Sequence, residues 1–417
     1  MEINSLYIHI PFCISKCAYC DFFSRAYTSV PDEYITALCN EISYRIKFYK
    51  ISVLKTIYIG GGTPSLLNEN QFQKLFSHIK SQMAFSSDVE ITVEVNPDDV
   101  SSSLLETLQS CGVNRISCGI QSMNDAALKT ACRRADSAAN KNALSLLKNY
   151  WQGDVSVDLI SGLPGDDETA LLKSLEEVCA INPSHISLYS LTIEDETPFG
   201  KKLSCGQLSY DFDKADKLWL YGRDFLEAHG YKWYEVSNFC KDGKECRHNL
   251  AYWTHRDYLG CGSGATGTVY NNDGSALRWT NTTDIEKYIS FWNETVGDAV
   301  ISESGSDGDR NLNEDLFFAN RLSDRNLSEA QTGENIEASV SEFEFFMMEL
   351  RKTSGFMENE FERIFNKPLP QKFLYLFEKW EGNGLCVRRK IEGEGGVRYC
   401  MSREGMLFLN RFLEELC

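Results

Sequence analysis

The first half of the chain alternates between short apolar runs and segments whose apolar residues recur at helical spacing. Six runs have the composition of buried strands, at 5–10, 54–60, 88–97, 115–122, 154–165 and 185–193. Helical periodicity follows five of them, at 31–50, 68–80, 101–112, 124–148 and 167–181. Repeated strand–helix units predict an α/β fold with a parallel sheet covered by helices. Because eight units fill a complete barrel, about six predict an open, three-quarter TIM-like barrel.

After about residue 200 the pattern changes. One long amphipathic helix is predicted at 210–230, a strand at 231–239, and a loop-rich stretch at 246–267. The tail alternates helical segments with a short hairpin, the outline of a small winged-helix-like domain. We therefore expect a barrel, an α+β region, a polar linker or insertion, and a C-terminal domain, at 1–225, 226–300, 301–341 and 342–417.

Three cysteines follow the first predicted strand at close spacing, in the stretch CISKCAYC: Cys13, Cys17 and Cys20. A structural zinc site needs four ligands, commonly from two separated Cys-x-x-Cys pairs, and this chain has no second pair. A four-iron cluster held by three thiolates leaves one iron open, and that iron can chelate the amine and carboxylate of S-adenosylmethionine. The spacing favours a [4Fe-4S] cluster with S-adenosylmethionine, and structural zinc or three packed core cysteines are the alternatives.

Glycine and polar residues follow the next predicted strands, where barrel proteins keep their chemistry. The loop GGGTPS at 60–65 lacks the Lys-Ser/Thr ending of a phosphate-binding loop. Its glycines allow close backbone approach to a ligand, or simply a tight strand–helix turn. Four polar residues at or just beyond successive strand ends are candidates to hydrogen-bond a ligand: Glu94, Gln121, Arg133 and Asp158. Taken singly, each is equally typical of a solvated loop or a helix cap.

The net charge, the apolar segments and the cysteine content argue against several classes of protein. The formal net charge of -18 argues against a general nucleic-acid binder, and against membrane attachment except through a local patch. No signal peptide and no transmembrane segment is apparent. The 15 cysteines are an odd number and mostly lie singly, which is unlike a secreted disulfide scaffold. We expect a reducing, cytoplasmic compartment.

Several motifs taken together resemble the radical SAM superfamily. They are YIHIPFC with the cysteine stretch, GGGTPS, EVNP, CGIQS, DLISGLPG, TP at 197–198, YEVSNF and HNLAYW. Within the superfamily they are similar to the branch that contains oxygen-independent coproporphyrinogen III oxidase and the HemW family of heme chaperones. The resemblance covers about residues 5 to 270 strongly and the tail loosely. It implies a radical SAM barrel and, at 226–300, a region associated with porphyrin or heme.

The resemblance implies positions for the cofactors. The three cysteines are the expected metal ligands, and the glycine loop is expected to accept the methionyl ammonium. Expected S-adenosylmethionine contacts are Tyr7, Tyr19, Gly61, Gly62, Thr63, Glu94, Gln121, Arg133, Asp158 and Thr192. In RHNLAYW, His248 is a candidate heme ligand or propionate partner, and Tyr252 and Trp253 are candidates to pack on a macrocycle. A buried structural histidine among core aromatics is the alternative.

Two features separate the branches. Phe22 stands where the oxidase has an additional cysteine, and the chain begins four residues before SLYIHI, without the oxidase's N-terminal stretch. Both features resemble the HemW family, which implies heme binding and delivery to acceptors such as respiratory hemoproteins, with an electron donor such as flavodoxin or ferredoxin. Oxidative decarboxylation of coproporphyrinogen is the alternative function. The chain departs from the branch at Ala135 and Thr266, where histidine is usual.

Overall fold

The computed structural model describes residues 3–298, 327–391 and 396–417. Its main sheet holds the six predicted strands side by side and parallel: β1 (Ser5–Ile10), β4 (Val53–Gly61), β5 (Ala84–Val95), β6 (Arg115–Gln121), β7 (Asp154–Ser161) and β8 (His185–Ser190). Among the described strands, β1 and β8 pair with other strands and not with each other, so the sheet stays open. The predicted partial barrel is confirmed.

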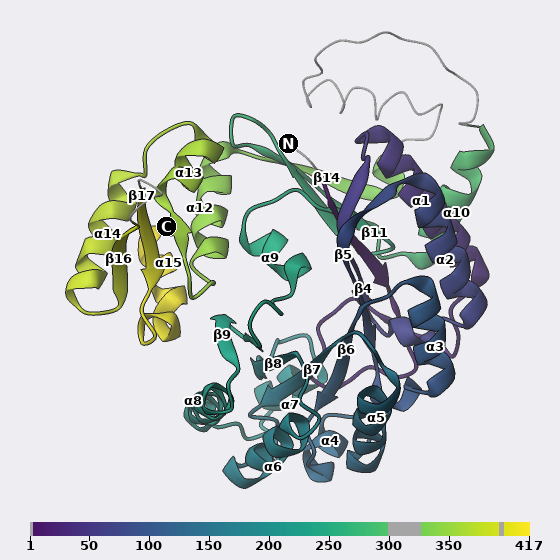
Figure 1. Ribbon diagram of the computed structural model, residues 1–417, viewed down its shortest axis with the longest axis horizontal. Helices are drawn as coiled ribbons and strands as arrows, with labels where there is room; N and C mark the ends of the chain where they lie inside the picture. The colour runs from purple at the N-terminus through teal and green to yellow at the C-terminus, as the bar shows by residue number, and fades with distance from the viewer. Residues whose placement is uncertain (1–2, 299–326, 392–395) are drawn as a thin grey trace.

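Helices cover the outer face of this sheet (Figure 1). They are α1 (Asp32–Phe48), α2 (Glu69–Gln82), α3 (Ser102–Cys111), α5 (Ser137–Tyr150), α6 (Glu168–Cys179) and α8 (Phe212–Ala228). The short helices α4 (Asp125–Thr130) and α7 (Pro198–Ser204) lie beside the loop that follows β1, where the Ala18 N–H donates to the Ala131 carbonyl and the Phe199 N–H donates to the Ala18 carbonyl, both at 2.9 Å. The segment predicted as one helix at 124–148 forms two helices, α4 and α5. The reason is local: Cys132 has a positive φ of 55°, and the Asp136 side chain accepts from the Ala139 N–H to begin α5.

Strands from beyond residue 230 extend both edges of the sheet. β11 (Leu259–Cys261) pairs in parallel with β1, whereas β10 (Asn238–Cys240) and β9 (Lys232–Glu235) add antiparallel beside β8. The prediction of one strand at 231–239 was wrong, because the chain reverses there and the Glu235 carboxylate accepts from the Ser237 N–H at 3.1 Å. The stretch predicted as loop-rich contains β11 and the helix α9 (Arg247–Trp253), which lies between the sheet and the C-terminal domain (Figure 1).

A second, antiparallel sheet joins β12 (Thr266–Tyr270), β13 (Ala276–Asn281) and β14 (Gln331–Ile336), and α10 (Ile285–Asp298) packs on α1. Of the predicted polar linker at 301–341, residues 301–326 lie outside the described residues.

The C-terminal domain has helices α12 (Ala338–Glu349), α13 (Glu358–Phe365), α14 (Gln371–Gly382) and α15 (Leu409–Leu416) around strands β15 (Phe356–Met357), β16 (Cys386–Ile391) and β17 (Gly396–Met401). Within the described ranges, every helix is too short or too polar to span a bilayer.

Candidate functional site

The cysteine loop follows β1 and is closed at its base by two short strands. β2 (Phe12–Cys13) pairs in parallel with β3 (Arg25–Ala26), and the Tyr27 N–H donates to the Cys13 carbonyl at 2.8 Å. The thiols of Cys13, Cys17 and Cys20 are all free and half-buried. A short, closed loop therefore presents the three sulfur atoms together at the carboxyl end of the first barrel strand.

These thiols line a cavity of about 550 Å³ at the carboxyl ends of the barrel strands, which we call the cysteine cavity. Most residues predicted to contact S-adenosylmethionine line it as well: Tyr19, Gly61, Gly62, Thr63, Glu94, Gln121, Arg133, Asp158 and Thr192. Tyr7 instead lines a smaller neighbouring cavity. Residues spread over 180 positions of sequence thus meet in one space, although their individual roles stay predictions.

Two of the sulfurs receive hydrogen-bond donors. The Thr63 hydroxyl lies 3.3 Å from the Cys13 Sγ, and the Arg133 guanidinium lies 3.5 Å from the Cys17 Sγ. Cysteine binds metal as the thiolate, and a thiolate sulfur can accept both of these hydrogen bonds. Burial raises the pKa of the Cys20 thiol, so metal binding there must displace a proton.

No three Cys, His, Asp or Glu side chains of the described ranges converge on a single metal position. A single zinc ion would need such convergence, whereas a four-iron cluster binds each thiolate through a different iron. Three free thiols lining one open cavity therefore fit a cluster better than a mononuclear zinc site.

The glycine loop packs so closely that side chains are excluded from it. A Cβ on Gly62 would lie 2.7 Å from the Phe12 carbonyl oxygen, and Gly61 has a φ of 113°. The Gly61 N–H donates to the Glu94 carboxylate at 3.1 Å. The close packing and the positive φ require glycine here. The same glycines leave backbone without side chains in the cavity wall beside the cysteines.

Four carboxyl side chains line the cavity, and two of them, Glu94 and Asp158, lie close to one another. Glu94 accepts from the Tyr58 hydroxyl at 2.8 Å, and Asp158 accepts from the Ser117 hydroxyl at 2.9 Å. Burial, with a further contribution from the Asp158 charge, raises the pKa of Glu94 to about 7. Burial likewise raises the pKa of Asp158. A ligand that brings hydrogen-bond donors or positive charge would stabilise the ionised form of both carboxyls.

Two further polar atoms in the cavity wall are buried and lack a partner in the described structure: the Gln121 Oε1 and the Arg133 Nε. Gln121 has a φ of 67°, an uncommon conformation that turns the chain at the end of β6. Buried polar atoms without partners are rare, and they mark a place for a polar ligand. This wall fits the hydroxyl, amine and carboxylate groups of S-adenosylmethionine.

Sequence reasoning missed some residues of this wall. Asn96 accepts from the Arg133 guanidinium at 2.8 Å, and the Gly119 carbonyl accepts from it at 2.6 Å, so together they aim Arg133 at Cys17. Tyr58 holds Glu94, and Tyr189 lines the cavity. Asn96 lies two residues beyond Glu94 within the EVNP motif, a spacing that was available as a signal.

The smaller neighbouring cavity, of about 180 Å³, we call the aromatic cavity. It is lined by Tyr7, Phe22, Tyr58, Gly61, Glu94, His248, Asn249 and Tyr252. Phe22, Gly61 and Glu94 belong to both cavities, so the two adjoin. The Phe22 side chain is 71% exposed at their common border.

Of the residues predicted to bind heme, His248 and Tyr252 line the aromatic cavity. The His248 ring is bonded through Nδ1 to the Thr56 hydroxyl at 2.9 Å and through Nε2 to the Tyr252 hydroxyl at 2.8 Å. Burial lowers the pKa of His248 to about 3, so the ring is neutral. Trp253 faces elsewhere, with the Arg351 guanidinium 5.5 Å from its ring.

Tyr7 and His9 brace the cysteine loop. The His9 Nε2 lies 2.9 Å from the Phe23 carbonyl oxygen, which can only accept, so this nitrogen carries the proton. The His9 Nδ1 is therefore an acceptor, and the Tyr7 hydroxyl donates to it at 2.8 Å. Burial lowers the pKa of His9, in keeping with the neutral ring. Tyr7 thus links the aromatic cavity to the end of the cysteine loop.

Comparison with known proteins is consistent with this geometry. Residues 7–178 match the radical SAM superfamily. A protein named heme chaperone HemW from Escherichia coli K12 is 40% identical over 280 residues, which are 67% of this chain and 73% of the relative. Another of that name, from Lactococcus lactis, is 32% identical over 418 residues, which are 99% of this chain and 97% of the relative.

One solved structure is similar over the whole chain. The coproporphyrinogen III oxidase HemN from Escherichia coli, described as a radical SAM enzyme, matches with a TM-score of 0.76 at 19% identity. The match covers 100% of this chain and 90% of that one. At this identity the likeness establishes the fold alone, including the presence of a C-terminal domain beside the partial barrel.

Proposed function

The chain belongs to the HemW family of the radical SAM superfamily, and from this premise we propose that it is a heme chaperone, which binds heme and delivers it to an acceptor protein. Membership of the superfamily implies a [4Fe-4S] cluster and S-adenosylmethionine. When bound, the cluster supplies one-electron chemistry and an open iron for the amine and carboxylate of S-adenosylmethionine.

Different residues of the cysteine cavity would hold the [4Fe-4S] cluster and S-adenosylmethionine. Cys13, Cys17 and Cys20 would ligate the cluster, with Thr63 and Arg133 donating to two of the sulfurs. Glu94 and Asp158 would accept from the amine and hydroxyl groups of S-adenosylmethionine. Gln121 would accept through its unpartnered oxygen.

The observation that carries the chaperone proposal is the aromatic cavity beside the cysteine cavity, with Phe22 at their border. A porphyrin is a large, flat, mostly apolar ring, and aromatic side chains pack well on such faces. His248 is neutral, and neutral imidazole is the form that ligates iron. Ligation through Nε2 would require His248 to release Tyr252, and we propose that heme binding opens the aromatic cavity in this way.

The cellular setting is part of the proposal. All 15 thiols are free, which supports a reducing, cytoplasmic compartment. The expected partners are a heme acceptor, such as a respiratory hemoprotein, and a one-electron donor of the flavodoxin or ferredoxin class.

Titration of the full-length protein with hemin tests heme binding. Wild type should develop a Soret band at one heme per chain, and His248→Ala should weaken the affinity about ten-fold or more and shift the band. His229→Ala, on the exposed end of α8, is the matched control and should behave as wild type. Equal affinity and spectrum in His248→Ala would remove His248 from the proposal.

The alternative function is oxidative decarboxylation of coproporphyrinogen III, the reaction of the oxidase in the branch that the sequence motifs resemble. The reconstituted protein should be incubated anaerobically with coproporphyrinogen III, S-adenosylmethionine and a low-potential reductant. We expect no protoporphyrinogen from a protein with an intact cluster, together with transfer of bound heme to an apo-hemoprotein. Many turnovers would establish the oxidase and show that Phe22 does not distinguish the two branches.

A further inference from the structure

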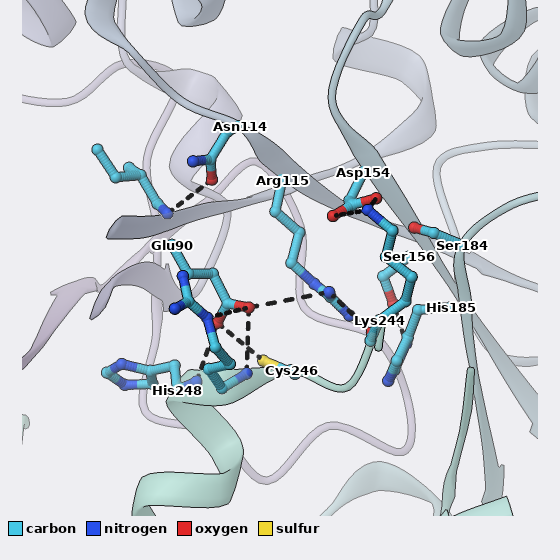
Figure 2. Close-up of polar contacts among 12 residues, drawn as sticks. Glu90, Asn114, Arg115, Asp154, Ser156, Ser184, His185, Lys244, Cys246 and His248 are labelled. Atoms are coloured by element: carbon cyan, nitrogen blue, oxygen red, sulfur yellow. Dashed lines mark hydrogen bonds and ion pairs between the residues drawn. The ribbon is translucent and has the colours of Figure 1, made fainter. Parts of the chain in front are cut away.

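A buried polar cluster lies on the barrel strands before their cavity-lining positions, and Figure 2 shows Glu90, Arg115 and His185 of this cluster. Glu90, Arg115 and His185 are on β5, β6 and β8, each an even number of residues before a cavity-facing position of its strand. Even spacing along a strand places side chains on one face, so these residues point into the barrel interior. With Tyr234 of β9 they form what we call the floor cluster. The cofactor contacts described above make no use of it.

One segment of chain, residues 244–248, crosses the floor cluster and is held there by its backbone. The Cys246 N–H donates to the Tyr234 hydroxyl at 3.3 Å. The Arg247 N–H donates to one oxygen of Glu90 at 3.1 Å, and the His248 N–H donates to the other oxygen at 2.9 Å. Three successive amides at the start of α9, which have no partner within the helix, are satisfied in this way.

The charge of Glu90 is compensated within the barrel. The Arg115 guanidinium lies 3.9 Å from the Glu90 carboxylate, and the two side chains are only 3% and 8% exposed. The same guanidinium donates to the Lys244 carbonyl at 3.1 Å. Figure 2 shows the ion pair above the turn that leads through Cys246 to His248. The pair therefore holds the segment at both ends and leaves no isolated buried charge.

His248 connects the floor cluster to the aromatic cavity. Its backbone N–H is bound to Glu90, while its ring spans from Thr56 on β4 to Tyr252 one helical turn later. A shift of the segment would carry both rings away from the cavity wall. We propose that Glu90 is a positioning residue, which fixes the start of α9 and so sets His248 and Tyr252 in the wall of the aromatic cavity; its effect on heme rests on the proposed function.

Asp88, two residues earlier on the same strand, provides a matched control. It pairs with the Arg247 side chain at 2.7 Å, but it is 72% exposed and binds none of the three amides. Exposed pairs contribute little, because water and salt screen them. Glu90→Gln and Asp88→Asn make the same chemical change on one strand, and only the first removes the proposed anchor.

The test is hydrogen exchange on the full-length protein, read by mass spectrometry of peptides. In Glu90→Gln one carboxylate oxygen becomes an NH₂ group facing a backbone N–H, so amides of residues 246–253 should exchange about ten-fold faster or more. Peptides of the cysteine loop, residues 13–23, contain no residue of the floor cluster and should be unchanged. Asp88→Asn should match wild type. Unchanged exchange at 246–253, or equal acceleration throughout the barrel, would overturn the proposal.

A milder variant keeps the proposal falsifiable if Glu90→Gln does not fold. Tyr234→Phe removes the acceptor of the Cys246 N–H together with the partner of the His185 Nε2, and it leaves both Glu90 contacts in place. It should accelerate exchange in the same segment by a smaller factor. No acceleration there would count against an anchored segment.

Hemin titration then separates the two proposals. Glu90→Gln should bind hemin several-fold more weakly than Asp88→Asn, with a shifted Soret band, while the iron content after reconstitution stays at about four per chain. Unaltered hemin binding by Glu90→Gln would overturn the link to the aromatic cavity. A wild type that binds no hemin would refute the chaperone function, and the exchange experiment would still decide whether Glu90 anchors α9.

Discussion

The two ends of the barrel interior are built from the chain in different ways. At the cysteine cavity, most wall residues lie on a barrel strand or in the loop after it, although Arg133 follows α4, and the three thiols fall within eight residues of sequence. At the floor cluster, Glu90 binds backbone groups that follow it by 157 and 158 residues. A loop after a strand can carry a recognisable motif, whereas a contact across such a distance leaves no local pattern.

The two ends also differ in how completely their polar groups are paired. The cysteine cavity keeps unpartnered atoms on Gln121 and Arg133, and two buried carboxyls with raised pKa values. At the floor, both oxygens of Glu90 accept from backbone amides and Arg115 balances its charge, although the Arg115 Nη2 is buried without a partner. The raised pKa values and unpartnered atoms around an open cavity are typical of a ligand site, whereas the backbone contacts of Glu90 are typical of a structural support.

The largest effect is expected from removing one thiol of the cysteine cavity. Cys17→Ala should lose the brown chromophore after anaerobic reconstitution, because two remaining thiolates do not hold a four-iron cluster. Iron analysis should fall from about four per chain to near zero. Cys132→Ala, which removes an exposed thiol outside the cavity lining, should reconstitute as wild type. Retention of the full iron content in Cys17→Ala would refute the cluster assignment.

A second test uses the raised pKa of Glu94. The folded, ligand-free protein holds this proton up to about pH 7, whereas the ordinary pKa of the carboxyl is 4.5, so folding binds a proton between these two pH values. The free energy of unfolding should therefore fall as pH rises from 4.5 to 7, by up to about 3 kcal/mol from this group. Denaturant unfolding across this range should show a shallower fall in Glu94→Gln.

Glu106→Gln, on the exposed face of α3, is the control for Glu94 and should keep the wild-type pH dependence. Identical pH profiles for Glu94→Gln and wild type would show that the cavity does not penalise the charged carboxylate.

Beside the floor cluster, Thr56→Val tests the hydrogen bond that pairs the buried His248 Nδ1. Valine keeps the shape but leaves the His248 Nδ1 buried without its partner, which should lower the free energy of unfolding by about 1–2 kcal/mol. Urea unfolding at neutral pH measures this loss. Thr130→Val on the exposed surface of α4 should change it by less than about 0.5 kcal/mol. An equally small effect at Thr56 would mean that this site tolerates an unpaired nitrogen.

The smallest effect is expected away from both ends. Arg403 of the C-terminal domain pairs with Asp224 and Glu227 of α8, but its side chain is 40% exposed. Arg403→Ala should lower the free energy of unfolding by less than about 1 kcal/mol, and the difference should shrink in high salt. A larger loss would show that this contact is a principal anchor of the C-terminal domain.

The sequence by itself determined the elements whose signals are local. Each of the six barrel strands carries its own apolar run and turn residues, and α3 ends at Gly112, as its glycine predicts. The close spacing of the three thiols indicates a metal-cluster site without any structure. Nine of the ten predicted S-adenosylmethionine contacts line the cysteine cavity, because the carboxyl ends of parallel strands meet at one edge.

Tertiary structure decided what depends on distant partners. The helix α9 lies in a stretch rich in aromatic and glycine residues, and its start is held by Glu90 and Tyr234 rather than by a capping residue of its own. Strand β11 is three residues long and exists only beside β1. A strand or helix this short has too few internal hydrogen bonds to form alone, so its partners elsewhere in the chain determine it.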